Sequence, residues 1–199
     1  MPIYTRTGDT GSTSLFGGKR ILKCEELVEV YGSLDELNSW VGHIASLFPS
    51  PDVKQFLQSI QSDLFTIGST LAGWKSGDLT GLDGRVKEME ARIDAMEESL
   101  PPIKNFILPG GSELAAHAHI TRSICRRVER QTVSLKVRKV REVPPFAKAT
   151  GGKRDVKEGN LDAMIKYLNR LSDLFFMLAR FINKQENVDE IVWQGKQNY

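Results

Sequence analysis

The chain has 199 residues, of which 40% are hydrophobic, so it can bury one good core, and we expect a single domain over residues 1–199. Its 27 basic and 25 acidic residues give a formal net charge of +2. This is not the strong excess of basic residues typical of polyanion-binding proteins, so nucleic acid is not an expected partner. No stretch approaches the roughly 18 apolar residues of a membrane span, and we expect no membrane association.

Cysteine usage and the amino terminus bear on the compartment. Cys24 and Cys125 provide neither a disulfide framework nor metal-ligand spacing, which favours a reducing environment. No secretory or transit peptide precedes Tyr4. The expected location is therefore the cytoplasm, or the mitochondrion if a transit peptide has been removed.

The amino-terminal segment, residues 4–17, is rich in glycine and hydroxyl side chains. Glycines let backbone N–H groups turn toward a ligand, hydroxyls add donors, and the cations Arg6, Lys19, Arg20 and Lys23 provide the charge that a polyphosphate requires. We interpret the segment as an ordered phosphate-binding strand and loop. From the residues alone, a glycine-rich hairpin that packs on the body and binds nothing is the alternative.

Neither common phosphate loop fits this segment. A Walker A motif ending at Gly18 and Lys19 needs a glycine at position 13 and a Ser or Thr at position 20, where the chain has Thr13 and Arg20. No dinucleotide-binding glycine fingerprint follows a strand and opens a helix.

Apolar residues recur every three or four positions in five later segments, which predicts five helices in an all-α antiparallel bundle. The predicted helices cover residues 24–48, 51–71, 86–100, 112–135 and 161–182. Ser50 and Pro51 form the expected N-cap and first helical position of the second helix, and Ser112 can cap the fourth. Loops are predicted at 73–84 and at 137–159, the latter a mobile surface excursion that is basic and contains Pro and Gly.

Three helices carry a polar row beside the apolar one. The row on the first predicted helix consists of Tyr31, Asp35, Asn38 and Gly42. The row on the fourth consists of Arg122, Arg126 and Glu129, with Arg127 and Arg130 nearby. The row on the fifth consists of Asn169, Asp173, Phe176 and Arg180. Charged residues commonly flank bundle seams, so each row alone fits a solvated face. Four arginines within nine residues would repel one another on a bare surface, so we expect them to face an anion, carboxylates or a neighbouring subunit.

The histidines and possible nucleophiles indicate neither a metal site nor nucleophilic catalysis. His117 and His119 are two residues apart and point to different helix faces, so no metal pair is expected, and His43 is expected to pack or face solvent. No Ser/His/Asp or Cys/His arrangement has specific support. Catalysis would therefore depend on binding and orientation.

Five motifs in order resemble the PduO-type ATP:cob(I)alamin adenosyltransferases over nearly the whole chain. They are residues 5–9 (TRTGD), 31–39 (YGSLDELNS), 106–111 (FILPGG), 126–130 (RRVER) and 167–173 (YLNRLSD). The resemblance implies a five-helix homotrimer with ATP at each subunit interface. It implies transfer of the 5′-deoxyadenosyl group of ATP to the cobalt of cob(I)alamin, giving adenosylcobalamin and triphosphate, with Mg²⁺ on the phosphates and no metal site in the protein itself.

The resemblance also implies site residues. One wall of the ATP site consists of Thr5, Arg6, Thr7, Gly8, Thr13, Ser14 and Lys23. The other consists of Arg126, Arg127, Val128, Glu129 and Arg130, with Asn169 as a further contact. Asp35 and Arg122 would join neighbouring subunits beside the corrin, and Phe106 would fill the space below cobalt, displacing the lower axial ligand to give four-coordinate Co(II) before reduction. The residues implied in catalysis are Arg126, Asp35, Arg122 and Phe106.

The resemblance divides the chain into an ATP-binding segment, residues 1–23, and a helical bundle, residues 24–190, with a loop insertion near 137–159 that is longer than in typical members. The loop could cover the active site or bind a partner. A flavoprotein reductase and a cobalamin-dependent mutase are the implied protein partners. The alternative function is a non-catalytic module that binds cobalamin and delivers it to a mutase; a purely structural bundle does not explain the amino-terminal glycines.

Overall fold

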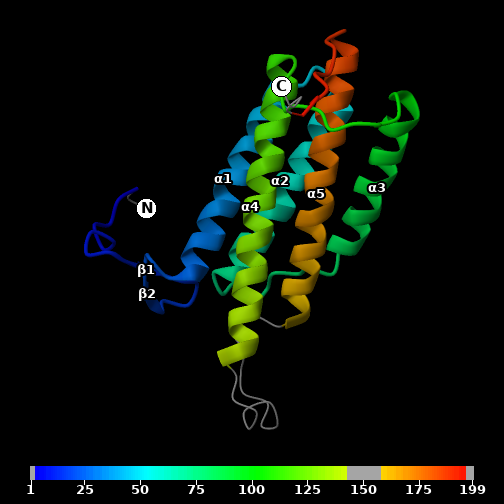
Figure 1. The fold of residues 1–199 in the computed structure, drawn as a ribbon. Coiled ribbons are helices and arrows are strands. Elements are labelled where there is room, and N and C mark those ends of the chain that lie inside the picture. Colours follow the sequence, from blue (N-terminus) through cyan, green and yellow to red (C-terminus); the bar gives the residue numbers. More distant parts are fainter. Residues whose placement is uncertain (1–2, 143–157, 196–199) are drawn as a thin grey trace.

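Five helices and one short hairpin make up the regular structure of residues 3–142 and 158–195, the part of the chain that the computed structural model describes (Figure 1). The elements are β1 (Ser12–Ser14), β2 (Arg20–Leu22), α1 (Glu26–Leu47), α2 (Pro51–Leu71), α3 (Leu82–Ser99), α4 (Glu113–Glu142) and α5 (Glu158–Gln185). The five predicted helices are therefore confirmed. None of them, within the described ranges, is long and apolar enough to cross a bilayer.

Several helix boundaries differ from the prediction. α4 continues past residue 137, where a loop was predicted. The sequence from Glu113 to Glu142 contains no Pro or Gly that would end the helix, and the next proline is Pro144. α5 begins at Glu158, before the predicted start at residue 161. α3 begins at Leu82, inside the predicted loop 73–84, because Leu82 is buried against the core and its packing offsets the poor helix propensity of Gly84. The rest of the predicted 137–159 loop, residues 143–157, lies outside the described residues.

The predicted helix starts are confirmed at two positions. Pro51 is the first residue of α2 and Ser50 precedes it as the N-cap, although the Ser50 side chain makes no capping hydrogen bond. Ser112 precedes α4, and its Oγ accepts a hydrogen bond of 3.4 Å from the backbone N–H of Ala115. This bond satisfies one of the free donors at the helix start.

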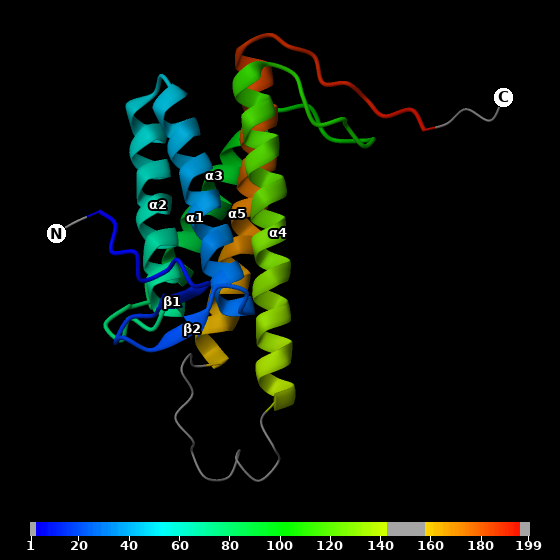
Figure 2. The same ribbon diagram turned by 90° about the vertical axis from the view of Figure 1, so that its left-hand side faces the viewer.

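The apolar rows of the helices meet in one core. α1 packs on α2 and α4, while α5 packs on α4 and α3, so α4 and α5 lie side by side in both Figures 1 and 2. Leu34, Leu64, Cys125 and Phe175 are at most 2% exposed. Burial raises the pKa of the Cys125 thiol well above its usual value, so Cys125 is a core residue, not a reactive one.

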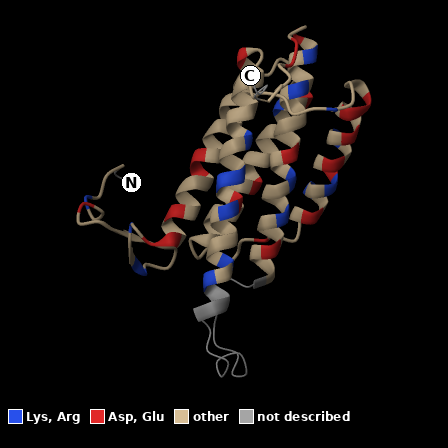
Figure 3. Cartoon of the chain, viewed as in Figure 1, with Lys and Arg blue, Asp and Glu red and all other residues tan. Residues whose placement is uncertain are grey.

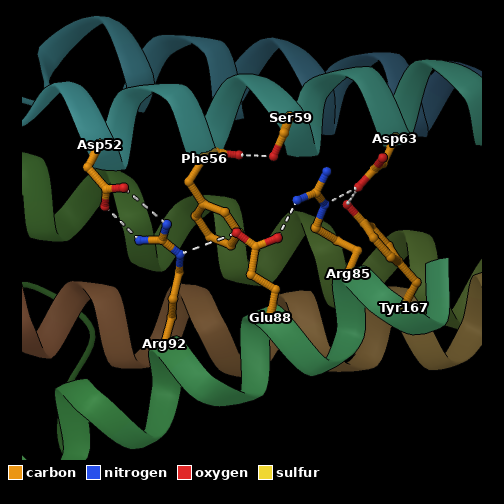
Figure 4. A network of polar contacts seen from close by, with 8 residues as sticks. All are labelled: Asp52, Phe56, Ser59, Asp63, Arg85, Glu88, Arg92 and Tyr167. Atoms are coloured by element: carbon orange, nitrogen blue, oxygen red, sulfur yellow. Dashed lines mark hydrogen bonds and ion pairs between the residues drawn. The ribbon is translucent and has the colours of Figure 1, made fainter. Parts of the chain in front are cut away.

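Polar side chains join α3 to α2 (Figure 4). Arg85 on α3 donates to the Asp63 carboxylate on α2 at 2.8 Å, and about two turns later Arg92 donates to Asp52 at 2.9 Å. The Tyr167 hydroxyl on α5 donates to the same Asp63 carboxylate at 3.2 Å. Burial raises the pKa of Tyr167 well above its usual value, and the Asp63 charge raises it further. Asp63 therefore accepts hydrogen bonds from two other helices.

The amino-terminal segment forms the hairpin of β1 and β2, with Thr13 opposite Ile21. The N–H of Phe16, in the hairpin loop, donates to the Ala72 carbonyl at the end of α2 at 2.8 Å. The hairpin lies beside the start of α1 (Figure 1). The segment is thus an ordered element held on the bundle, which both the strand-and-loop interpretation and the hairpin alternative predicted.

We expect Arg85→Met to lower the free energy of unfolding by about 1–3 kcal/mol, because it leaves the partly buried Asp63 carboxylate without its charged donor. Urea unfolding followed by circular dichroism measures the change. The matched control is Lys166→Met, which breaks the exposed ion pair between Lys166 on α5 and Asp83 on α3 and should leave the unfolding midpoint almost unchanged. Equal effects of the two substitutions would contradict the role assigned to Arg85.

Candidate functional site

Arg20 closes the amino-terminal loop over the hairpin. Its guanidinium donates to the Thr7 carbonyl at 2.6 Å and to the Ser14 hydroxyl at 3.3 Å, and it also bonds to the carbonyl and hydroxyl oxygens of Ser12. The donors of Arg20 are thus engaged by the protein. Arg20 therefore shapes the loop, and because its acceptors are neutral oxygens, its charge is not neutralised by these bonds.

The structure brings several predicted amino-terminal residues together. The Thr5 and Thr7 hydroxyls lie 2.8 Å apart, and the Lys23 ammonium packs against Gly8, where a Cβ atom would lie 3.3 Å from it. Arg6 has a φ of +60°, a strained conformation for a residue other than glycine. Thr5, Arg6, Thr7 and Lys23 are all exposed. This face of the loop therefore presents two hydroxyls and two cations outward.

A second cluster lies on α4 and α5. Arg126, Glu129, Arg130 and Asn169 line a cavity of about 460 Å³ together with Val133 and Ser134. The Asn169 amide donates to the Glu129 carboxylate at 3.0 Å, which fixes both side chains across the seam between the two helices. Figure 3 shows the successive Lys and Arg bands on α4. Among the described residues, no carboxylate is within ion-pair distance of Arg126 or Arg130.

Two members of the predicted arginine motif point elsewhere. Arg127 makes an ion pair with Glu36 on α1, so its charge is neutralised within the chain. Val128 is completely buried in the core, and its side chain is not part of the cavity lining. The structure therefore gathers Arg126, Glu129 and Arg130 around one cavity, while Arg127 lines a second cavity, of about 520 Å³, that Arg130 also borders.

Arg122 lies one turn before Arg126, in a partly buried position. Its guanidinium carbon is 5.8 Å from the ring centre of Phe176 on α5, and its Nε is buried without a hydrogen-bond partner. Burial lowers the pKa of Arg122, and the Arg126 charge lowers it further. Asp35 is exposed on α1, and within the described part of the chain no ion pair joins it to Arg122. An ion pair between Asp35 of one subunit and Arg122 of the next would require Asp35 to be exposed in the single chain, as it is.

Phe106 lies on the connection between α3 and α4, with its ring 80% exposed. The ring centre is 6.4 Å from that of Trp193, in the segment after α5. Ile107 and Val192 form an isolated antiparallel bridge between the two segments. An exposed phenylalanine is thus held at a defined position by a second part of the chain.

The three histidines occupy two different environments. His117 approaches the exposed His43, with 3.3 Å between Nδ1 and Nε2, whereas His119 is buried against Phe176. Burial lowers the pKa of His119, and the Arg122 charge lowers it further. No group of three or more His, Cys, Asp or Glu that could hold a metal ion occurs within residues 3–142 and 158–195.

Sequence reasoning missed Trp193 and Glu190, and it treated Arg20 only as a source of charge. Trp193 and Glu190 follow the last predicted helix, and no periodic pattern marks such a segment. The signal available for Glu190 was indirect: Arg180 falls on the inner half of α5, and a buried arginine requires a carboxylate partner.

The chain matches the family model described as cobalamin adenosyltransferase over residues 3–182. It is 38% identical over 199 residues to the corrinoid adenosyltransferase of Bacillus subtilis strain 168, which covers 98% of this chain and 93% of the relative. It is 34% identical over 206 residues to corrinoid adenosyltransferase PduO of Citrobacter freundii, covering 100% of this chain and 55% of that relative.

Solved structures agree with the sequence relatives. One holds a phenylalanine-to-alanine variant of the PduO-type ATP:corrinoid adenosyltransferase from Lactobacillus reuteri complexed with cobalamin and ATP. It is 33% identical in sequence, with a TM-score of 0.81 over 98% of this chain and 100% of that chain. The chain belongs to the cobalamin adenosyltransferase family.

We expect Arg20→Met to release the amino-terminal loop without unfolding the bundle, because Arg20 bonds both the loop and β1. Hydrogen exchange of the Leu15 and Lys23 amides measures this, since these N–H groups donate at 2.9 Å to carbonyls within the same segment. Protection of both amides should fall, while that of α1 stays unchanged. Retained protection at both amides would show that Arg20 does not organise the loop.

Proposed function

We infer that the protein transfers the 5′-deoxyadenosyl group of ATP to the cobalt of a reduced corrinoid. The observation that carries this inference, beside the family membership, is the cavity between α4 and α5. There Arg126 and Arg130 stand with no carboxylate partner among the described residues, next to polar groups suited to a nucleoside. A module that only delivered cobalamin would have no use for such a cavity.

The charged residues of the cavity suit different parts of a bound nucleotide. Arg126 and Arg130 attract the triphosphate, because a guanidinium binds phosphate oxygens through two parallel hydrogen bonds. Glu129 is an anion and repels phosphate, so its place is at the nucleoside end, where a carboxylate accepts hydrogen bonds from hydroxyl or amino groups. Asn169 holds that carboxylate in position through the 3.0 Å hydrogen bond.

The amino-terminal loop supplies the second wall, and it comes from a neighbouring subunit of a homotrimer. Within one chain the hairpin lies beside the start of α1, while α5 lies on the other side of α4 in this view (Figure 1). The cavity is lined by residues of α4 and α5. Thr5, Thr7 and Lys23 are exposed and do not line the cavity of their own chain, so we assign them to the cavity of a neighbour. Ile120, an exposed apolar side chain on α4, would gain from burial at such an interface.

The chemistry requires orientation more than a protein nucleophile. Cobalt(I) supplies the electron pair, the Co–C5′ bond forms, the C5′–O5′ bond breaks, and its electron pair leaves with triphosphate. The protein must hold C5′ in line with cobalt and stabilise the growing negative charge on the leaving group. Arg126, Arg130 and Lys23 are the cations placed for this task.

Mg²⁺ fits this site only as a partner of the phosphates. Glu129 is the single carboxylate lining the described cavity, and it is assigned to the nucleoside end, so Mg²⁺ would be held by substrate phosphates and water. When bound, Mg²⁺ would neutralise phosphate charge.

Phe106, Asp35 and Arg122 serve the corrin. The exposed Phe106 ring fills the space under cobalt and displaces the lower axial ligand, because loss of that ligand makes Co(II) easier to reduce. Arg122, whose Nε has no partner among the described residues, meets Asp35 of the next subunit. This pair closes the interface beside the corrin.

We expect Arg126→Met to reduce turnover at saturating ATP by about 100-fold or more while the protein stays folded, because the leaving triphosphate loses a fixed cation. Formation of light-sensitive adenosylcobalamin from ATP, Mg²⁺ and cob(I)alamin measures turnover. The control is Arg138→Met, which removes an arginine of the same helix that pairs with Glu26 outside the cavity, and it should retain wild-type turnover. Undiminished activity of Arg126→Met would refute the assignment.

We expect Phe106→Ala to keep the ATP affinity of the wild type and to lose the four-coordinate Co(II) state, because nothing then occupies the space below cobalt. Electron paramagnetic resonance of cob(II)alamin with the protein and ATP detects this state. A four-coordinate signal equal to that of the wild type would remove Phe106 from the mechanism.

A further inference from the structure

Polar side chains near the end of α5 hold the connection between α3 and α4. Arg180 and Asn183 are only 3% and 2% exposed, and both turn toward this connection. A buried polar group is costly unless its hydrogen bonds are made, so the partners of these two residues show what the burial achieves.

Arg180 fixes the start of the connection and the tail after α5 at the same time. Its guanidinium donates to the two Glu190 carboxylate oxygens at 2.7 and 3.2 Å and to the Pro101 carbonyl at 2.9 Å. Pro101 directly follows α3 and its C-cap, and Glu190 lies in the tail. One buried side chain therefore ties two separate segments to α5.

Asn183 fixes the other end of the connection. Its Nδ2 donates to the Gly110 carbonyl at 3.1 Å, and its Oδ1 accepts from the Ser112 N–H at 3.0 Å, directly before α4. Gly111 has a φ of +105°, and a Cβ atom there would overlap the Asn183 amide. Glycine at this position is thus required both by the backbone and by the close approach of Asn183.

Phe106 lies between these two anchors. The tail, residues 186–195, runs antiparallel to the connection beside Phe106. The Leu108 N–H donates to the Ile191 carbonyl and the Trp193 N–H donates to the Phe106 carbonyl, both at 2.8 Å. The two segments run together beyond the bundle in Figure 2, and both lie at its upper end in Figure 1. A two-stranded pair of this length is marginal in water by itself, so its order depends on the anchors at its base.

We propose that Arg180 and Asn183 are positioning residues that preorganise Phe106 for the corrin, with Glu190 as the charge partner of Arg180. The proposal rests on the proposed function of Phe106. Neither side chain needs to touch the substrate: each fixes one end of the connection that carries the ring. Holding the ring in place before the corrin arrives lowers the ordering cost of binding.

The first experiment needs no substrate. Hydrogen exchange at the Leu108 and Trp193 amides reports the pairing directly, and we expect Arg180→Met and Asn183→Ala to reduce protection at both by about tenfold or more. Glu190→Gln changes only the tail, keeps the shape of the side chain and provides a milder variant that folds. The control is Arg85→Met, which breaks a charged contact at the α2–α3 seam, where the arginine side chain is 24% exposed, and it should leave both amides protected.

The second experiment asks whether the order matters for the reaction. We expect the same variants to lower the four-coordinate Co(II) signal about tenfold while the ATP dissociation constant stays within about twofold, since a small misplacement of a positioned group is enough to lose its effect. Arg180→Lys should restore part of the signal, because a lysine keeps the charge facing Glu190 but cannot also bond Pro101 in the fixed fork geometry of arginine.

The outcomes separate the claims. Unchanged protection at Leu108 and Trp193 in Arg180→Met and Asn183→Ala would overturn the anchoring role. Lost protection with an unchanged four-coordinate signal would overturn the positioning role. A protein in which Phe106→Ala also leaves that signal unchanged would instead overturn the proposed function of Phe106, while the exchange result for the anchors would still stand.

Discussion

The arrangement of charge on α4 constrains the rest of the molecule. Arg126 and Arg130 lie one turn apart, Arg122 lies one turn before them, and within the described residues no carboxylate pairs with any of the three. Like charges at this spacing on a helix repel one another. Arg127, on the neighbouring face, is neutralised by Glu36. The uncompensated charge is therefore confined to one face, and a polyanion bound there would remove its cost.

α5 supports both parts of the proposed site. Asn169 on this helix fixes Glu129 at the cavity, and Arg180 and Asn183 on the same helix hold the connection that carries Phe106. Eleven residues separate Asn169 from Arg180, which corresponds to roughly 16 Å along a helix. Because α5 packs on both α3 and α4, the nucleotide and corrin parts of the site share one rigid element. Substitutions that shift α5 are expected to affect both.

The sequence predicted what local patterns determine. Apolar periodicity placed five helices, and Pro51 and Ser112 marked two of their starts correctly. The end of α4 and the start of α3 were predicted wrongly, because composition suggested loops where packing and the absence of proline favour helix. Motif order placed Arg126, Glu129, Arg130 and Asn169 in one group, and the structure brings these residues together around one cavity.

What the sequence could not provide depends on contacts between distant segments. Arg20 was predicted only as a source of charge, and its hydrogen bonds to Thr7 and β1 could not be predicted from the sequence. The pairing of Trp193 with Phe106 joins positions 87 residues apart, and neither segment has a periodic pattern. Arg180 was visible only as one member of a polar row, and its role follows from its contacts with Pro101 and Glu190.

The central claim is that each nucleotide lies between the amino-terminal loop of one subunit and the α4 cavity of the next. Mixing unfolded Arg126→Met and Lys23→Met subunits in equal amounts, refolding them together and measuring adenosylcobalamin formation tests it directly. In a closed ring with random assembly, about a quarter of the sites combine an intact loop with an intact cavity, so activity should recover to about a quarter of the wild-type value from two nearly inactive parents. A mixture no more active than the average of its parents would contradict the account.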